Sequence, residues 1–517
     1  MPVQPTYAID KEPCVPVRLT GGRQESLGLR DVLIRAHEIE DLALPLPPAV
    51  STLLRLLVAV TARITALDDP DMATGEWTAH RRRLLQQPSG FDPSAVHRYF
   101  DRYVWDLFDT ARPFLQDPRL AGQCQERAGV NKLVFGRPAG NNLAWLSPHH
   151  DTHPEPVPCD QALWHLLVHH SYGASGTCSA RTAGDVSSGN GTAGPLRSTI
   201  SFHPLGRTLY ETLLAGLPQP ADDWPETADR CPWEEPELPD PTAPLPPVTW
   251  PGRLLTGRSR HAILLVPDHD GRHVIDAYLT WATQHPKLQA RDPYLIHHFD
   301  PDKPVSQRLT PRKADADRAL WRDLDALLLA GDETSAVQRP AVFSTVNDLP
   351  GDLRARLRVR VCGFDQDGKT NNRIWYTALT PPIWPWVQEN DPSVAKRIAE
   401  CRIAADDTGS RLFKVSKEAW HETAFPPRDT AGGKKMPRHM PAWTLRTSAQ
   451  YWPRAEATFW RLIDQPSQPA PAAFAADAIT ALREVTRPAI AQHFRAARAV
   501  ARAVATLRRA SQRHTTP

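Results

Sequence analysis

The sequence predicts an α+β protein with a large mixed N-terminal domain over residues 1–380 and a C-terminal helical (four-helix) bundle over residues 381–517. Two patterns indicate this division. Apolar and polar residues alternate with the period of a strand through much of the stretch from Arg253 to about Thr380. After the Pro381–Pro382 pair, apolar residues recur instead at helical spacing.

The N-terminal domain is expected to be mixed because helical patterns precede and interrupt its strands. Val15–Leu19 has the character of a short strand. Helices are predicted over Ser51–Leu67, which has one apolar face, over the aromatic-rich Ser94–Phe108, and over Gln161–His170 and Ala319–Leu329.

Two long segments without periodicity, residues 136–160 and 172–195, are expected to be functional loops, because ordered domains rarely keep such loops otherwise. The second holds six glycines, which would let its backbone approach a DNA groove closely; a flexible linker is the alternative. Residues 217–251 carry eleven prolines and eight acids against one base. We expect an extended surface connection that an anionic partner would avoid.

The C-terminal bundle is predicted to hold helices over Ser393–Ala405, Ser410–Ala424, Ala442–Asp464 and Ala473–Arg513, the last with a kink or break at Pro488. No acid follows Glu484. Phe494, Ala497, Val500, Ala501, Val504 and Leu507 would form the apolar face of the last helix, opposite the arginines Arg495, Arg498, Arg502, Arg509 and Arg513. Such a basic stripe suits a phosphate backbone, and a solvated face without a ligand is the alternative.

Overall composition excludes several classes. The chain has 517 residues with 61 basic and 58 acidic side chains, so its net charge of +3 argues neither for nor against nucleic-acid binding, and the distribution of charge has to decide. Its seven cysteines form no C-x-x-C pair, which makes a disulfide framework or thiolate zinc site improbable. No signal peptide or membrane-length apolar run is recognised, so we expect a cytoplasmic protein without membrane contact.

Gly363–Thr370 reads G-F-D-Q-D-G-K-T and matches the phosphate-binding loop G-x-x-x-x-G-K-[ST]. A working loop of this kind needs a helix directly after it, whereas strand-like residues flank this one on both sides. We therefore predict an exposed, partly basic β-hairpin over residues 357–378, with Arg356, Arg358 and Arg360 as a basic row. A nucleotide hydrolase that uses Gly363–Thr370 is the alternative function.

Histidines gather around residues 149–170 and raise the possibility of a metal-dependent hydrolase. Adjacent histidines point apart, however, and no ligand spacing such as H-E-x-x-H occurs, so surface or loop histidines are favoured. We expect no metal, no cofactor and no catalytic residues. The cluster comprises His149, His150, Asp151 and His153, with His165, His169 and His170 nearby.

Six segments together carry a resemblance to a known family. In their order and spacing the chain resembles, nearly from end to end, the CasA-type large subunit of the type I-E CRISPR surveillance complex Cascade. The hairpin, Gly363–Ala378, is similar to that family's glutamine-wedge hairpin. The other segments are Pro16–Leu33, Pro113–Gln116, Asn141–Asp151, Gly252–Leu265 and Ala319–Leu324.

The resemblance implies a subunit that is not an enzyme. It would recognise the protospacer-adjacent motif in double-stranded DNA, help to unwind the target for guide pairing, and dock a helicase-nuclease. Base pairing with the guide would then read the remaining sequence, and the protein only the short motif. The implied partners are other Cascade subunits, the CRISPR guide RNA, duplex target DNA and its displaced single strand.

The resemblance also assigns residues. In the glycine loop, Gly184, Asp185 and Val186 would face the motif, and Gly189 and Gly191 are alternatives for the closest approach to the minor groove. The family's lysine corresponds to Lys303, or to Lys313 in another register. The wedge comprises Gln366, Asp367, Gly368, Lys369 and Thr370, and either Lys369 or Gln366 would insert. Asn141, Asn142 and Trp145 would anchor the subunit near the guide RNA, and Arg495, Arg498, Arg502 and Arg509 would hold the DNA backbone.

Overall fold

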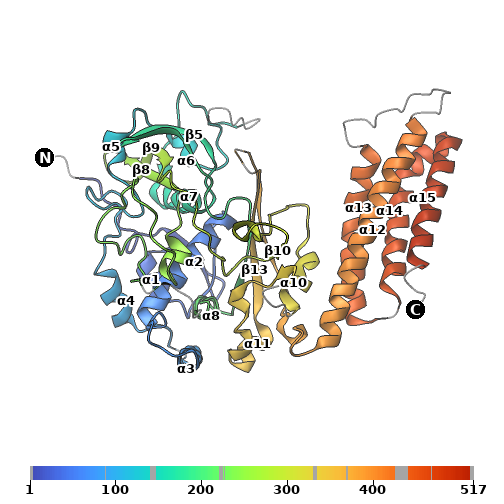
Figure 1. Cartoon of the computed structure of the whole chain (residues 1–517), viewed down its shortest axis with the longest axis horizontal. Coiled ribbons are helices and arrows are strands. Elements are labelled where there is room, and N and C mark those ends of the chain that lie inside the picture. The colour runs from blue at the N-terminus through green and yellow to red at the C-terminus, as the bar shows by residue number, and fades with distance from the viewer. Residues whose placement is uncertain are drawn as a thin grey trace. The chain divides into compact units, whose positions relative to one another are not determined.

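The structure is a computed structural model (Figure 1) that describes residues 4–512 except 88, 140–146, 221–224, 226, 330–334, 368, 370, 425–440 and 467. The chain divides into two compact units, which we call the N-terminal and C-terminal units. The first comprises Met1–Leu320 with Gly331–Pro385, and the second comprises Trp321–Ala330 with Trp386–Pro517. Mixed helices and strands followed by C-terminal helices confirm the predicted α+β class.

The centre of the N-terminal unit is the helix α2 (Pro47–Thr65), whose residues from Pro48 to Ala62 are all buried. Two prolines in its first turn suit the helix start, where no backbone donor is needed. Within the part of the chain that the structure describes, α2 is also the one helix long and apolar enough to cross a membrane. Most of it lies buried inside the protein, as in the core helix of a globular unit.

The strands form small antiparallel sheets rather than one large sheet. The sheet most relevant to the site has the order β14-β13-β7, and its middle strand packs on α2. The strands are β1 (Val15–Leu19), β2 (Gln24–Leu27), β3 (Ile39–Leu42), β4 (Val157–Pro158), β5 (Gly176–Ala183), β6 (Val186–Gly191), β7 (Ile200–Leu205), β8 (His261–Pro267), β9 (His273–Trp281), β10 (His297–Phe299), β11 (Leu309–Pro311), β12 (Val337–Gln338), β13 (Arg358–Gln366) and β14 (Asn372–Leu379).

Shorter helices cover these sheets in the N-terminal unit. They are α1 (Leu29–Ile34), α3 (Thr74–Leu85), α4 (Pro93–Phe100), α5 (Leu120–Gln123), α6 (Val130–Leu133), α7 (Cys159–Tyr172), α8 (Leu209–Ala215), α9 (Gly252–Thr256) and α11 (Gly351–Arg356). Single 3₁₀ turns lie at Val305–Gln307, Leu320–Asp323, Ala341–Phe343, Val346–Asp348 and Trp384–Trp386.

The C-terminal unit is a bundle of four long helices that run side by side (Figure 1). They are α12 (Pro392–Ala424), α13 (Ala442–Asp464), α14 (Ala470–Gln492) and α15 (Phe494–Gln512), and the short α10 (Leu324–Leu328) packs on α12. Arg402 of α12 donates to Asp325 of α10 at 2.8 Å, which fastens α10 to the bundle.

Several predicted helix boundaries are wrong. The predicted helix over Ser94–Phe108 ends at Phe100, and the aromatic residues after it pack into the core from a loop. The two helices expected before and after residue 409 are one helix, α12, because Gly409 leaves room for the rings of Tyr451 and Trp452. The last predicted helix breaks at His493 and not at Pro488, which α14 accommodates.

The prediction of a loop over residues 172–195 is wrong. Most of this segment forms the hairpin β5–β6, which we call the glycine hairpin. Its turn lies at Gly184, which has φ +56°, a left-handed conformation that glycine adopts without strain. Small Ser, Thr and Gly side chains give little hydrophobic alternation, so the strands left no periodic signal in the sequence.

Candidate nucleic-acid interface

The predicted hairpin at Gly363–Thr370 is present as β13 and β14, which we call the wedge hairpin. Strand β14 begins at Asn372, so the helix that a phosphate-binding loop requires is absent at this position of the structure. Gly363 lies beneath the ring of Tyr376, since a Cβ atom there would be 2.3 Å from the ring. The first glycine of the motif is therefore explained by packing, and the nucleotide-hydrolase alternative loses its structural basis.

The acids of the same motif shape the hairpin rather than a ligand site. Asp367 Oδ1 accepts hydrogen bonds from the backbone N–H groups of Lys369 and Asn371, each at 2.9 Å, and so closes the turn. Asp365 Oδ2 accepts from the backbone N–H of Ala316 at 3.3 Å. The turn thus presents Lys369, whose side chain is exposed, while Gly368 and Thr370 lie outside the described residues.

Gln366 points into the protein and not out of the wedge. Its side chain is buried, accepts from the backbone N–H of Ser198 at 3.2 Å, and donates to Asn372 Oδ1 at 2.7 Å and to Tyr172 O at 3.4 Å. Insertion of Gln366 into DNA would break these bonds. Of the two residues that the sequence offered for the wedge, Lys369 is therefore the exposed one.

The expected basic row before the hairpin is wrong. Arg360 is buried and forms an ion pair with Asp41, and Arg358 donates to the backbone oxygen of Thr380 at 2.9 Å. Arg356 belongs to α11 and pairs with Asp352 at 2.9 Å. Strand β13 is mostly buried, while β14 is mostly exposed. The exposed part of the hairpin is therefore its edge strand β14, and the three arginines form no basic face.

The glycine hairpin is anchored to the core close to its turn, and its tip is exposed. Arg181 lies three residues before the turn, and its fully buried side chain donates to Asp117 at 2.8 Å and to the backbone oxygen of Trp281 at 3.0 Å. At the tip, Gly184 and Asp185 are exposed and Val186 is partly buried. A surface that reads a groove through its backbone needs this combination.

The structure places the two candidate lysines differently. Lys303 is exposed and its ammonium lies 3.4 Å from Asp300 in the same loop. Lys313 is also exposed, and its backbone forms an isolated bridge with Thr199, whose backbone oxygen accepts from Phe364 N of the wedge hairpin at 3.3 Å. The neighbouring N–H of Ala314 donates to Ser198 at 2.8 Å. Among the described residues, contacts therefore bring Lys313 close to the wedge hairpin, and none does so for Lys303.

The anchoring residues Asn141, Asn142 and Trp145 lie outside the described residues, so their role stays a prediction. The two ends of their segment are fastened together. Arg137 donates to the backbone oxygen of Glu155 at 2.6 Å, and Asn131 donates to the backbone oxygen of His150 at 3.1 Å.

The acidic segment 217–251 is not merely a surface connection. Trp233 and Trp250 are buried, and Arg63 at the end of α2 binds Asp229 at 2.8 Å and Glu234 at 3.0 Å. The acids thus compensate buried arginines instead of only repelling a partner. The segment also forms one wall of a cavity of about 740 Å³ in the N-terminal unit.

The structure does not bring three ligand atoms of the histidine cluster within 4.8 Å of one another. Within the described ranges, the group with metal-ligand geometry is Asp268, Asp270 and His273 in the β8–β9 turn, where Asp268 already accepts from backbone N–H groups. In contrast, His169 is buried and bonds to Leu133 O at 2.8 Å. The metal-dependent hydrolase alternative therefore has no support from these residues.

Buried histidines predict a strong acid sensitivity of the N-terminal unit. Burial lowers the pKa of His165 to about 3 and the pKa values of His170, His261 and His297 to about 4. Between pH 6.5 and 4 the unfolded chain binds protons that the folded chain cannot, so stability falls with falling pH. Each histidine contributes up to about 1.4 kcal/mol per pH unit to this slope.

Urea unfolding at pH 7, 6 and 5 measures this slope. The slope of the unfolding free energy against pH counts the protons taken up on unfolding. We expect His170→Gln to lower that number by about one, and His153→Gln, at an exposed position, to leave it unchanged. Equal slopes for both variants and the wild type would contradict the assignment.

The arginines of α15 form the expected stripe on the C-terminal unit. Arg495, Arg498, Arg502 and Arg509 are exposed, while Val500, Val504 and Leu507 are buried and Ala497 is half-buried; Arg513 lies outside the described residues. Arg502 pairs with Glu422 of α12 at 3.1 Å, an exposed contact of small energy. Two expectations fail for the apolar face, because Ala501 is exposed and the side chain of Phe494 is 85% exposed.

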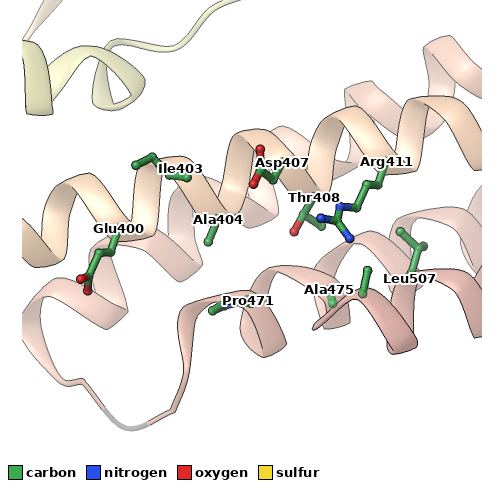
Figure 2. A pocket seen from close by; sticks show the side chains of 10 residues that line it. Glu400, Ile403, Ala404, Asp407, Thr408, Arg411, Pro471, Ala475 and Leu507 are labelled. Carbon is green, nitrogen blue, oxygen red and sulfur yellow. The ribbon is translucent and has the colours of Figure 1, made fainter. Parts of the chain in front are cut away.

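A small pocket lies between α12, α14 and α15 (Figure 2). Its volume is about 180 Å³, and its wall is mostly apolar, with the charged side chains of Glu400, Asp407 and Arg411 along α12. These groups belong to one helix and converge on no common point in Figure 2. The pocket therefore adds nothing that resembles a catalytic site.

Comparison with known proteins agrees with the resemblance found in the sequence. The chain matches the family described as CRISPR-associated protein Cse1 over residues 11–493. The CRISPR-associated protein CasA/Cse1 of Thermus thermophilus is 27% identical over 373 residues, which cover 69% of this chain and 67% of that protein.

Solved structures extend the match over the whole chain. A chain of a CRISPR RNA-guided surveillance complex is 39% identical, with a TM-score of 0.85 over 97% of this chain and 99% of that one. Thermus thermophilus CasA (Cse1) and Thermobifida fusca Cse1, at 20% and 19% identity and TM-scores of 0.72 and 0.73, share the fold, each over 98% of this chain and over 99% and 98% of their own. This chain belongs to the CRISPR-associated Cse1 (CasA) family.

Proposed function

We propose that this chain is the large subunit of a CRISPR RNA-guided surveillance complex, in which it recognises the protospacer-adjacent motif of duplex DNA and starts its unwinding. One observation carries the proposal. The segment 197–199 contacts the turn of the wedge hairpin, the neck of the glycine hairpin and the backbone of Lys313 just after β11. Three elements that are distant in sequence are thereby gathered at one place.

Each element would supply a different part of the reaction. Gly184, Asp185 and Val186 at the exposed tip of the glycine hairpin would lie against the minor groove, whose donor and acceptor pattern is degenerate. Lys313, or Lys303, would contact the motif as a cation. Lys369 would enter the duplex beside the motif, where separating a base step costs a few kcal/mol that protein contacts must offset.

The remaining parts of the chain would hold the partners. Asn141, Asn142 and Trp145 would bind near the guide RNA, and other subunits of the complex would hold the N-terminal unit. Arg495, Arg498, Arg502 and Arg509 would bind the phosphate backbone of target or displaced DNA, and the assembled subunit would dock a helicase-nuclease. None of these tasks needs a catalytic group, a metal or a cofactor.

Gel-shift titration of a guide-loaded core complex, with and without this chain, tests the proposal at fixed salt. Addition of the chain should tighten binding to a target with the correct motif and leave binding to a scrambled motif unchanged. Lys369→Ala should weaken binding to the correct target about tenfold, since one such contact is worth about 1–3 kcal/mol.

The control variant is Lys11→Ala, which removes an exposed lysine elsewhere in the N-terminal unit. Equal tightening on both targets would contradict motif recognition. An equal loss for the Lys369 and Lys11 variants would contradict the role of the wedge turn.

A further inference from the structure

Arg197 joins the two hairpins of the proposed interface. Its guanidinium donates to the backbone oxygens of Asp367 at 3.2 Å and Asn371 at 3.3 Å, and to Asn372 Oδ1 at 3.0 Å. These three residues form the turn of the wedge hairpin and the start of β14. The same guanidinium donates to the backbone oxygen of Tyr172 at 3.2 Å, on the other side.

Tyr172 and Arg197 lie at the two ends of the chain segment that contains the glycine hairpin. At these ends, Gly194 N donates to Gly173 O at 3.0 Å and Leu196 N donates to Ser171 O at 2.9 Å, which holds the two ends of the segment together as a neck. A single side chain therefore contacts the neck of one hairpin and the turn of the other.

Arg197 is a buried arginine that binds mainly backbone oxygens. Its side chain is only 4% exposed, yet the nearest acid, Asp367, lies 3.9 Å away, and mainly backbone oxygens receive its hydrogen bonds. A buried charge without a close counter-ion opposes folding, and burial accordingly lowers the pKa of Arg197 to about 10. An uncharged side chain would meet the needs of stability alone with less cost, so the contacts themselves point to a role in geometry.

We infer that Arg197 is a positioning residue that fixes the tip of the wedge hairpin relative to the glycine hairpin. The duplex would then be opened at a fixed distance from the motif that the glycine hairpin reads. The inference rests on the proposed function and deepens it. The planar fork of the guanidinium can hold several oxygens in fixed directions at once, which the single ammonium of a lysine cannot do.

The test uses Arg197→Lys, which keeps the charge and loses the fork, in the full chain assembled into the guide-loaded complex. We expect binding to the correct-motif target to weaken about tenfold and binding to the scrambled target to stay unchanged. Lys369→Ala should then cause no further loss in the Arg197→Lys background, because the wedge tip is already misplaced. A merely structural role would leave the two effects additive.

Arg81→Lys is the matched control. Arg81 is equally buried, burial lowers its pKa to about 10 as well, and it donates to a backbone oxygen, that of Thr345 at 3.0 Å, in contact with neither hairpin. Asn372→Ala is a second test, which keeps the buried charge and removes one contact of Arg197 together with the hydrogen bond that Gln366 donates to the same oxygen. It should reduce discrimination between the two targets in the same direction.

The outcomes separate the two proposals. If the wild-type chain does not distinguish the two targets, motif recognition itself is wrong. If the wild type distinguishes them and both the Arg197 and Asn372 variants do so equally well, only the positioning role is overturned. Loss of discrimination in the Arg81 variant to the same extent would likewise overturn it, since the effect would then follow general stability.

Discussion

Replacing Asp292 by alanine is expected to destabilise the N-terminal unit by about 3–5 kcal/mol, the cost of leaving a buried ion pair without one partner. Asp292 is buried, accepts from Arg55 Nη1 of α2 at 2.8 Å and 2.9 Å, and forms an ion pair with Arg258. Arg55 also lies over the ring of Tyr294 and donates to Ser201 Oγ at 3.0 Å. Without the carboxylate, two buried guanidinium groups would face each other uncompensated.

The carboxylate of Asp292 makes the stability of the N-terminal unit depend on pH in a second, lower pH range. Despite burial, the guanidinium groups of Arg55 and Arg258 lower the pKa of Asp292 to about 2. A carboxylate with a lowered folded pKa stabilises the protein above its unfolded value, near 4, and this stabilisation is lost as pH falls towards 2. The histidines act at higher pH, so the Asp292 variant should keep the loss of stability between pH 6.5 and 4.

Urea unfolding followed by tryptophan fluorescence measures both effects. Asp352→Ala is the control, because Asp352 pairs with Arg356 at the surface, with 70% of its side chain exposed, and its removal should cost less than about 1 kcal/mol. A loss of under 1 kcal/mol for Asp292→Ala would show that the buried network is not a major source of stability.

The elements that the sequence predicted well are those with a local signal. The wedge hairpin follows from alternation on both sides of a turn-forming Asp-Gly pair, and the bundle follows from apolar residues at helical spacing. The glycine hairpin was missed because its strands carry small polar residues, so neither period stands out. The break at His493 was misplaced because Pro488 gave the stronger signal.

The site was only partly predictable, because burial depends on distant partners. Arg360 appears in the sequence as part of a basic row, and only its ion pair with Asp41, 319 positions earlier, shows that it is buried. Gln366 is held by Ser198 and Tyr172 in the same way. Arg197 has no distinguishing neighbour in the sequence, so its contacts with the wedge turn could be found only in the structure.

Removal of the arginine stripe on α15 should have the largest effect on DNA binding. In the assembled complex, a variant with Arg495, Arg498, Arg502 and Arg509 changed to glutamine should bind target DNA about 100-fold more weakly. The slope of log affinity against log salt should become shallower by about 3–4, since each neutralised phosphate contributes about 0.9. Arg495 and Arg498 have no acidic partner among the described residues, so their charge is available to phosphates.

A charge-matched variant separates the stripe from net charge. It changes four exposed basic residues on the other bundle helices to glutamine, namely Lys396, Arg446, Arg483 and Arg487. If the stripe contacts phosphates directly, this variant should keep most of the salt slope, because long-range attraction is screened within about 10 Å at 0.1 M salt. Equal loss of slope in both variants would mean that the bundle attracts DNA by its total charge, and that α15 has no contact of its own.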